Sequence, residues 1–175
     1  MKWHRIDIAF VGICWFSAAL VVWLSATGCE QSSMVLWCIV FSTPVFVVGS
    51  VFVGWRRHTQ RSVFTALSGS LACLALIASV AIWQWPLRVS YGSSRSGFDL
   101  LAQRVRAGEQ LHMPQRVGLF TVRKAEVSRQ GVVCLWTLPN PAGSTGFVHC
   151  GRDHVPFNLW SLVKLDDHWQ FISED

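Results

Sequence analysis

The stretch Ile8–Ala26 reads IAFVGICWFSAALVVWLSA, and two stretches of the same character follow it, Met34–Trp55 (MVLWCIVFSTPVFVVGSVFVGW) and Val63–Trp85 (VFTALSGSLACLALIASVAIWQW). They are 19 to 23 residues long, and none contains Asp, Glu, Lys, Arg or His. The hydrocarbon core of a bilayer takes about 20 helical residues to cross. Each stretch therefore predicts a transmembrane helix, and residues 1–85 together predict a three-span membrane domain (spans 8–26, 34–55 and 63–85).

Basic residues between these stretches predict their orientation. Lys2 and Arg5 precede the first stretch, and three arginines lie in the connection Arg56–Arg61, whereas the connection Thr27–Ser33 has no basic residue and carries Glu30. Positive segments stay on the cytoplasmic side. We therefore expect a multi-pass protein of the cell membrane, with a cytoplasmic N-terminus and an extracytoplasmic C-terminal domain. Residues 1–85 contribute +3 of the net charge of +5, which this topology explains, and no basic stripe with interleaved aromatics predicts nucleic-acid binding.

The first apolar stretch also allows a second interpretation. Residues 1–26 have the basic start and apolar centre of a secretory signal peptide. Ala26-Thr27-Gly28-Cys29 loosely resembles a lipoprotein cleavage site, which would make Cys29 the lipidated first residue. Cleavage and retention of this stretch both remain open at this point.

Small residues predict how the helices pack in lipid. They recur on one helical face of the third stretch, and a second pair has small-xxx-small spacing in the second stretch. These candidate packing residues are Ser68, Ala72, Ala75 and Ser79, and Ser50 and Gly54. The same stripe also allows a homo-oligomer. Membrane lipid is the expected partner of all three helices, and the lack of charges within them argues against a channel or a proton relay.

The C-terminal half predicts a small α+β domain. Ser-rich residues 86–96 are expected to form a flexible tether, and residues 97–175 the domain itself. Apolar residues at helical spacing predict a helix over Phe98–Ala107, with Ser96 as its N-cap and Gly108 as its stop signal. Alternating residues and turn signals then predict an antiparallel sheet of about five strands. The expected strands are Val117–Val127, Val132–Leu138, Gly146–Cys150, Leu159–Leu165 and His168–Ser173, with Asp166-Asp167 as a solvated hairpin tip.

Two cysteines of this domain are disulfide candidates. Cys134 and Cys150 lie at similar distances from the turn near Ala142, so antiparallel pairing would bring them opposite each other. A bridge is expected in an oxidising compartment, where it would contribute about 3 kcal/mol. The alternative is two reduced, buried thiols. Cys14, Cys38 and Cys73 are expected to be small packing residues of the apolar helices.

His149, Asp153 and His154 are weak ligand or metal candidates beside Cys150. Their spacing matches no strong zinc pattern, and strand alternation points His149 away from Cys150. No catalytic, nucleotide-binding or cofactor motif occurs, so we expect no metal and no cofactor.

These patterns favour a small integral membrane protein that anchors an extracytoplasmic binding or assembly domain. Its expected partner is a protein or a cell-envelope component. Two alternatives stay open: a membrane-anchored enzyme with a Cys/His site around Cys134, His149, Cys150 and His154, and an accessory subunit of a transport complex.

Overall fold

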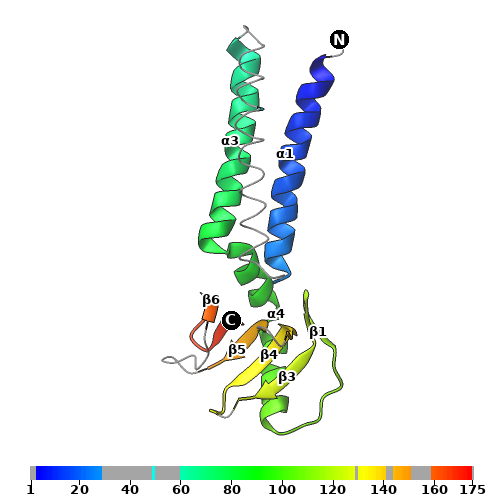
Figure 1. Cartoon of the computed structure of the whole chain (residues 1–175), viewed down its shortest axis with the longest axis vertical. Helices are drawn as coiled ribbons and strands as arrows, with labels where there is room; N and C mark the ends of the chain where they lie inside the picture. The colour runs from blue at the N-terminus through cyan, green and yellow to red at the C-terminus, as the bar shows by residue number, and fades with distance from the viewer. Residues whose placement is uncertain are drawn as a thin grey trace. The chain divides into compact units, whose positions relative to one another are not determined.

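A computed structural model describes residues 3–28, 49, 60–128, 130–140, 144–150 and 159–174. In the first helix, side chains are described from Gly12 onward. In the next helix, they are described from Leu71 onward and also at Ser68 and Gly69. The chain divides into two compact units: residues 1–25 with 31–86, and residues 26–30 with 87–175. We call them the helical unit and the α/β unit (Figure 1).

The helical unit contains α1 (Trp3–Ala26) and α3 (Gln60–Trp83). One buried cluster joins them, formed by Cys14, Ala18 and Val21 of α1 and by Cys73, Ile77 and Val80 of α3. The packing role expected of Cys14 and Cys73 is thus confirmed. The small-residue stripe is not the buried face of α3, because Ala72 and Ala75 are exposed. Cys73, Ile77 and Val80 form the buried face instead, and Ser50 and Gly54 lie outside the described residues.

The prediction of three transmembrane helices is wrong by the criteria of length and composition. Among the residues described with their side chains, no single helix is long and apolar enough to cross a bilayer. The part of α1 described with its side chains, Gly12–Ala26, is an apolar helix too short for a span, and the second predicted span, Met34–Trp55, lies outside the described residues except for Gly49. Leu71–Trp83 and Trp85–Arg106 pass the test together, but only as a pair bent at the break between them.

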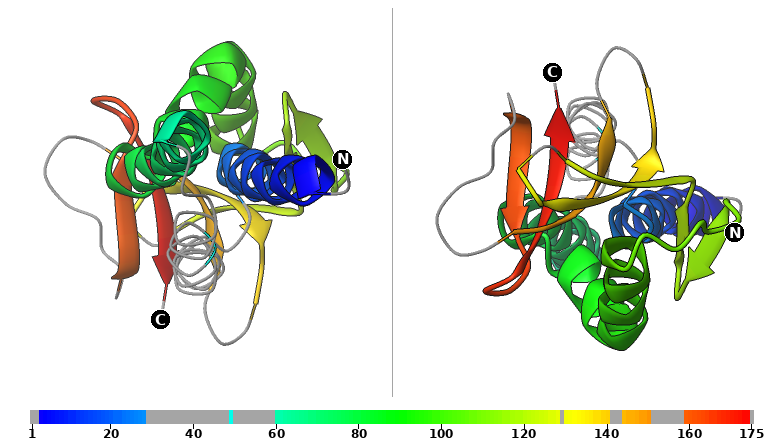
Figure 2. Two further views of the ribbon diagram at one scale, coloured as in Figure 1. Left: turned by 90° about the horizontal axis from the view of Figure 1, so that it is seen from above. Right: turned by 90° about the horizontal axis from the view of Figure 1, so that it is seen from below.

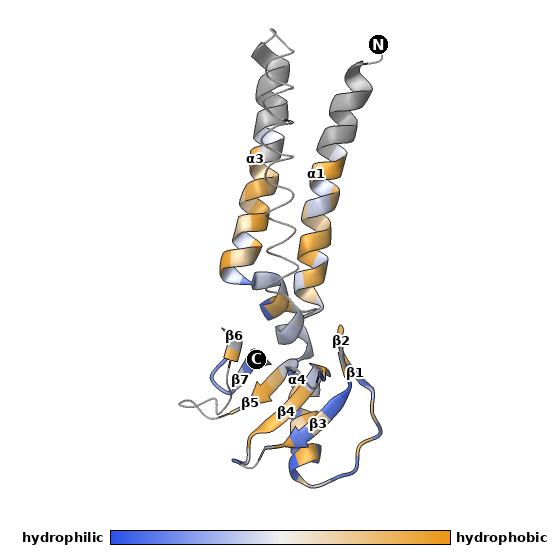
Figure 3. Ribbon diagram, viewed as in Figure 1, coloured by the Kyte–Doolittle hydropathy of each residue, from blue (hydrophilic) through white to orange (hydrophobic). Residues whose placement is uncertain are grey.

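The described parts of α1 and α3 nevertheless consist largely of hydrophobic residues, drawn in orange in Figure 3. Ile13, Phe16, Leu71 and Ile82 are each at least 60 % exposed. The break after α3 falls at Gln84, whose φ of 48° is the left-handed conformation that ends helices. Gln84 N donates to Val80 O at 2.9 Å, and Pro86 follows in the first turn of the next helix, where its missing N–H costs nothing.

The next helix, α4 (Trp85–Arg106), replaces the predicted tether. The Ser-rich residues 90–96 are helical because several of their serine side chains are buried or hydrogen-bonded within the helix. Ser90 and Ser94 are buried, and Ser93 Oγ donates to Ser90 O in the preceding turn at 2.8 Å. The helix predicted over Phe98–Ala107 is therefore the second half of a longer helix, and Ser96 lies in its interior rather than at its N-cap. Gly108, with φ of 74°, follows the end of the helix as predicted.

The five-stranded antiparallel sheet expected from the sequence is present in the α/β unit. Its order is β3 (Lys124–Val127), β4 (Val133–Leu138), β5 (Thr145–His149), β7 (Trp169–Glu174) and β6 (Leu159–Lys164). The predicted strand Val117–Val127 is instead three strands. β1 (Gln115–Val117) and β2 (Phe120–Val122) form a separate hairpin, because Gly118 adopts φ of 60° and reverses the chain there.

Helix α4 packs on one face of this sheet, drawn above the sheet in the left view of Figure 2 and below it in the right view. Among the described residues, the shared core contains six aromatic side chains, with Phe147 at its centre. Its ring centroid lies 4.3 Å from that of Phe98, 4.7 Å from that of Phe120 and 5.0 Å from that of Phe171. The residues of α4 in this core are Leu87, Tyr91, Phe98, Leu101, Ala102 and Val105. This packing fixes one face of α4 on the sheet and leaves the two flanks of the helix for contacts outside the core.

Candidate functional site

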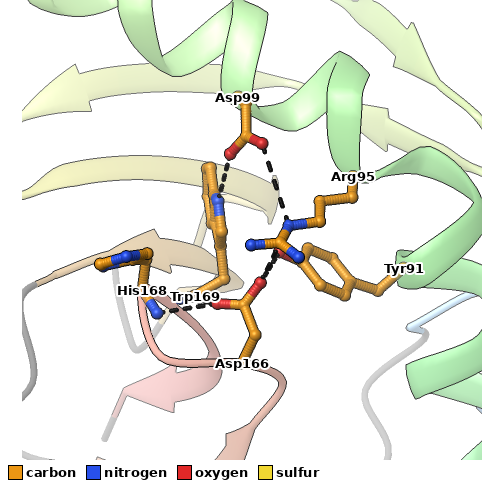
Figure 4. Close-up of polar contacts among 6 residues, drawn as sticks. All are labelled: Tyr91, Arg95, Asp99, Asp166, His168 and Trp169. Carbon is orange, nitrogen blue, oxygen red and sulfur yellow. Dashed lines mark hydrogen bonds and ion pairs between the residues drawn. The ribbon is translucent and has the colours of Figure 1, made fainter.

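The first flank of α4 meets the turn between β6 and β7 through a polar network (Figure 4). Tyr91 Oη donates to Asp166 Oδ2 at 2.7 Å, and Trp169 Nε1 donates to Asp99 Oδ1 at 2.8 Å. Arg95 Nε lies between the two acids, 3.3 Å from Asp166 Oδ2 and 4.0 Å from Asp99 Oδ2. Tyr91, Arg95 and Asp99 recur every four residues, so they share one face of the helix. We call these five residues the clasp.

Asp166 also builds its own turn. Its Oδ1 accepts hydrogen bonds from the backbone N–H groups of His168 and Trp169, each at 2.8 Å. Burial alone would raise the pKa of this carboxyl, but the bonds from Tyr91, His168 and Trp169 and the charge of Arg95 together bring its pKa below the ordinary value. The expected hairpin turn is present, but Asp166 is a partly buried acceptor rather than a solvated tip. Every group of the clasp thus has a structural partner.

His149 lies beyond the clasp on the same side of the sheet. Its Nδ1 is 2.7 Å from Arg106 Nη2, and its ring packs edge-on against Trp169 and parallel to His168, with centroids 4.9 Å and 5.8 Å away. Because a guanidinium only donates, Nδ1 of His149 is the acceptor and the imidazole is neutral. Burial, and then the charge of Arg106, lowers the pKa of His149. This histidine therefore serves as a neutral link between β5 and α4.

The second flank of α4 borders an open hollow of about 370 Å³. One wall is the helix face that carries Ser93, Ser96, Leu100 and Arg104, and the opposite wall is β1 with the glycine that follows it. Close packing at one end fixes the two walls. A Cβ on Gly118 would overlap Ser94 Oγ, and one on Gly97 would lie 2.9 Å from Val117 Cγ1. Glycine at both positions thus lets the hairpin approach the helix.

Two guanidinium groups stand in the lining of this hollow. Arg116 Nε donates to Gly118 O at 3.2 Å, and no acidic side chain among the described residues pairs with it. Arg104 is held by Glu109, which Gly108 brings back toward the helix. Arg104 Nε donates to Glu109 Oε2 at 2.7 Å, and Nη2 bonds the second oxygen. This hydrogen-bonded pairing lowers the pKa of Glu109. The hollow is therefore a cationic and partly apolar site.

The cysteines predicted as a disulfide lie on the sheet face opposite α4. Cys134 pairs in register with Val148, so Cys150 is its diagonal neighbour rather than its direct partner. Both are buried and are free thiols in this structure. Burial chiefly, and then the nearby carboxylates of Glu126 and Glu174, raises the pKa of Cys134 to about 12, and burial also raises the pKa of Cys150. These groups are thiols at neutral pH, and a bridge between them stays a prediction.

The structure does not bring His149 together with these cysteines. His149 contacts Trp169 on the α4 side, whereas Cys134 and Cys150 pack with Trp136, Val148 and Ile172 on the other. The sheet separates the imidazole from both thiols, as strand alternation predicted. Asp153 and His154 lie outside the described residues. Among the residues that are described, no group of three or more His, Cys, Asp or Glu side chains could hold a metal ion.

Sequence reasoning missed the hollow because its walls come from separate elements. Arg104 and Arg116 are twelve positions apart, and nothing in their spacing indicates that α4 and β1 lie side by side. The signal that was present is local. Gly97 and Gly118 are positions where a side chain would prevent close approach, and each borders the site.

Comparison with known proteins gives no relative of this chain. No protein-family model matches it, no curated protein matches it, and no solved structure matches it.

Proposed function

We propose that the protein is a binding protein without catalytic activity, and that its ligand occupies the hollow between α4 and β1. The observation that carries this proposal is the chemistry of the lining. Its described residues offer hydroxyl groups, an amide, two guanidinium groups and apolar side chains, but no carboxylate, imidazole or thiol. Such a set can hold and orient a ligand. It lacks a general base that could activate one of its serines as a nucleophile.

The alternative of a Cys/His enzyme has no geometric support among the described residues, which do not include His154. A nucleophilic cysteine needs a thiolate with a base within hydrogen-bonding reach. Burial raises the pKa of both Cys134 and Cys150, and His149 lies across the sheet from them. No observation on the described residues favours a role in a transport complex.

The location of the protein and its macromolecular partners stay predictions. These are the cell membrane with a cytoplasmic N-terminus, contact with membrane lipid, a protein or cell-envelope partner, and a homo-oligomer. The exposed apolar side chains of α1 and α3 are the feature of the structure that bears on contact with an apolar partner.

Filling the hollow tests the binding proposal. Ser96 is an exposed lining residue, so Ser96→Trp would occupy the hollow without disturbing the core. Gln103→Trp places the same side chain at an exposed position of α4 outside the lining and is the matched control. The full chain is screened by saturation-transfer NMR against a mixture of small organic acids, alcohols and amines.

We expect at least one probe to bind both the natural chain and the Gln103→Trp variant. The same probe should not bind the Ser96→Trp variant. If no probe binds in a manner that depends on Ser96, the hollow is not a ligand site and the proposal fails.

A further inference from the structure

The lining of the hollow also indicates which chemical class it accepts. We propose that the ligand is an amphipathic organic anion, a carboxylate on an apolar body, held by Arg116 and Arg104. This inference rests on the proposed binding function and names the ligand of the same site.

Charge is the first argument. The described lining residues include two arginines and no acid, and Glu109 offsets the charge of Arg104 alone, so the described part of the site is net positive and attracts anions. Arg116 is the principal anchor, because its Nε is fixed to the backbone oxygen of Gly118 and no acidic side chain among the described residues neutralises it. A guanidinium oriented in this way presents its remaining N–H groups to a carboxylate with little loss of side-chain entropy.

Glu109 supplies the second argument, because it occupies Arg104 as a ligand carboxylate would. Its two oxygens bind Nε and Nη2 of Arg104 in the side-by-side arrangement typical of arginine–carboxylate pairs. Both side chains are exposed to solvent, so water competes with this pair and a ligand can displace Glu109 at low cost. Glu109 thus acts as an internal competitor for one of the two cationic groups.

The apolar walls supply the third argument. Leu101 and Val117 line the hollow from the core side, and Leu100 lines it while 60 % exposed. An exposed leucine beside two guanidinium groups gains most from a ligand that covers it with an apolar chain. An inorganic anion would satisfy the arginines but would leave this surface in water.

Three probes of related structure separate charge from apolar contact. Hexanoate has both features, 1-hexanol has the chain without the charge, and acetate has the charge without the chain. Binding to the full chain is followed by NMR titration of the Gly97 and Gly118 amide signals, which report on the two walls. We expect hexanoate to bind at least about tenfold more tightly than either of the other probes.

Two variants then test the residue assignment in opposite directions. Arg116→Gln should weaken hexanoate binding by about tenfold or more, because it removes the cation that no acidic side chain among the described residues neutralises. Glu109→Gln should strengthen it by a few fold, because it frees Arg104 from its internal competitor. Gln103→Glu, at an exposed position of α4 outside the lining, lowers the net charge of the chain by one, as Arg116→Gln does, and should have little effect.

The outcomes separate this inference from the function on which it rests. If 1-hexanol binds as tightly as hexanoate in a Ser96-dependent manner, or if Arg116→Gln has no effect on hexanoate, the anion assignment is wrong while the hollow remains a binding site. If acetate binds as tightly as hexanoate, the apolar part of the assignment is wrong. If none of the three probes shifts Gly97 or Gly118, the amphipathic-anion assignment is overturned, and the screen with the wider mixture decides whether the hollow binds anything.

Discussion

Asp166 shows at the scale of one residue how the α/β unit is held together. Its carboxylate accepts from one side-chain hydroxyl and two backbone N–H groups, and Arg95 lies beside it. The pKa of Asp166 is therefore lower in the folded protein than in the unfolded chain, despite the opposing effect of burial. A group of this kind stabilises the fold above the unfolded pKa of about 3.9, and its contribution is lost as the pH falls through the folded value.

The contribution of Tyr91 to this interaction can be measured with one substitution. Tyr91→Phe keeps the buried ring and removes the hydroxyl that donates to Asp166. We expect the free energy of unfolding of the α/β unit to fall by about 1–3 kcal/mol at neutral pH, as for hydrogen bonds to charged groups. The pKa of Asp166 should move up, toward its ordinary value, because a donor to the charged form is gone.

Urea unfolding at neutral pH and an NMR titration of the Asp166 carboxyl measure both effects. Ser93→Ala is the matched control, since it removes a hydroxyl that donates only to a carbonyl of its own helix. An unchanged stability of the Tyr91→Phe variant would show that Tyr91 contributes only its ring.

Sequence reasoning reached part of this residue-level picture. Local patterns predicted the turn at Asp166-Asp167. They also predicted that His149 and Cys150 lie on opposite faces of the sheet, and both features are present in the structure. The contact between Tyr91 and Asp166 spans 75 positions, and no spacing rule connects residues so far apart. It depends on how α4 crosses the sheet, which one sequence does not contain.

At the scale of elements, His149 links the strand β5 to the C-terminal end of α4. Its neutral imidazole accepts from Arg106, so protonation would remove the acceptor and place a cation beside a guanidinium. Burial chiefly, and then the charges of Arg106 and His168, disfavour the charged imidazole, and a backbone hydrogen bond and Asp99 partly offset them. The pKa of His149 is consequently lower in the folded than in the unfolded protein, where it is about 6.5.

The lowered pKa of His149 makes the free energy of unfolding depend on pH. Above about pH 6.5 His149 is neutral in both states and has no effect on the pH dependence. As the pH falls below that value, the unfolded chain takes up the proton first, so the free energy of unfolding decreases until the folded pKa is reached. We expect a loss of stability of the α/β unit between neutral and mildly acidic pH.

Chemical denaturation at a series of pH values measures this loss. His149→Gln should flatten the dependence, because the amide oxygen still accepts from Arg106 but does not titrate. His112→Gln, at an exposed position outside the core, should leave the dependence as it is in the natural chain. If both variants keep the same slope, the titration of His149 does not control it.

Element boundaries show where sequence patterns failed and why. Serine at residues 90, 93, 94 and 96 has the composition of a flexible tether, but these residues are helical because two serines are buried and a third bonds its own helix. Tertiary burial here overrides local propensity. Alternation over Val117–Val127 predicted one strand, but the φ of Gly118 divides it into separate strands. The hollow lies at this division, so the error in the strand also hid the site.

At the scale of the whole molecule, the apolar composition of the three stretches predicted membrane-spanning helices that the described residues do not show. A membrane-spanning helix requires about 20 residues that are both apolar and continuous. Among the residues described with their side chains, Gly12–Ala26 is shorter than that, and Leu71–Trp83 passes the test only together with Trp85–Arg106, with a bend at the break between them. The sequence shows the apolar composition of the third stretch, but it gives no sign of the left-handed Gln84 that ends α3.

The division of the chain into two compact units predicts two unfolding transitions. Each unit has a buried cluster of its own, centred on Phe147 in the α/β unit and on Cys73 and Ile77 in the helical unit. Phe147→Ala should remove about 3–5 kcal/mol from the α/β unit and lower only one transition in scanning calorimetry of the full chain. Ile77→Ala should remove about 2–5 kcal/mol from the helical unit and lower the other. A single transition that both substitutions lower together would mean that the units unfold as one cooperative structure, because in that case a cavity in either core destabilises both.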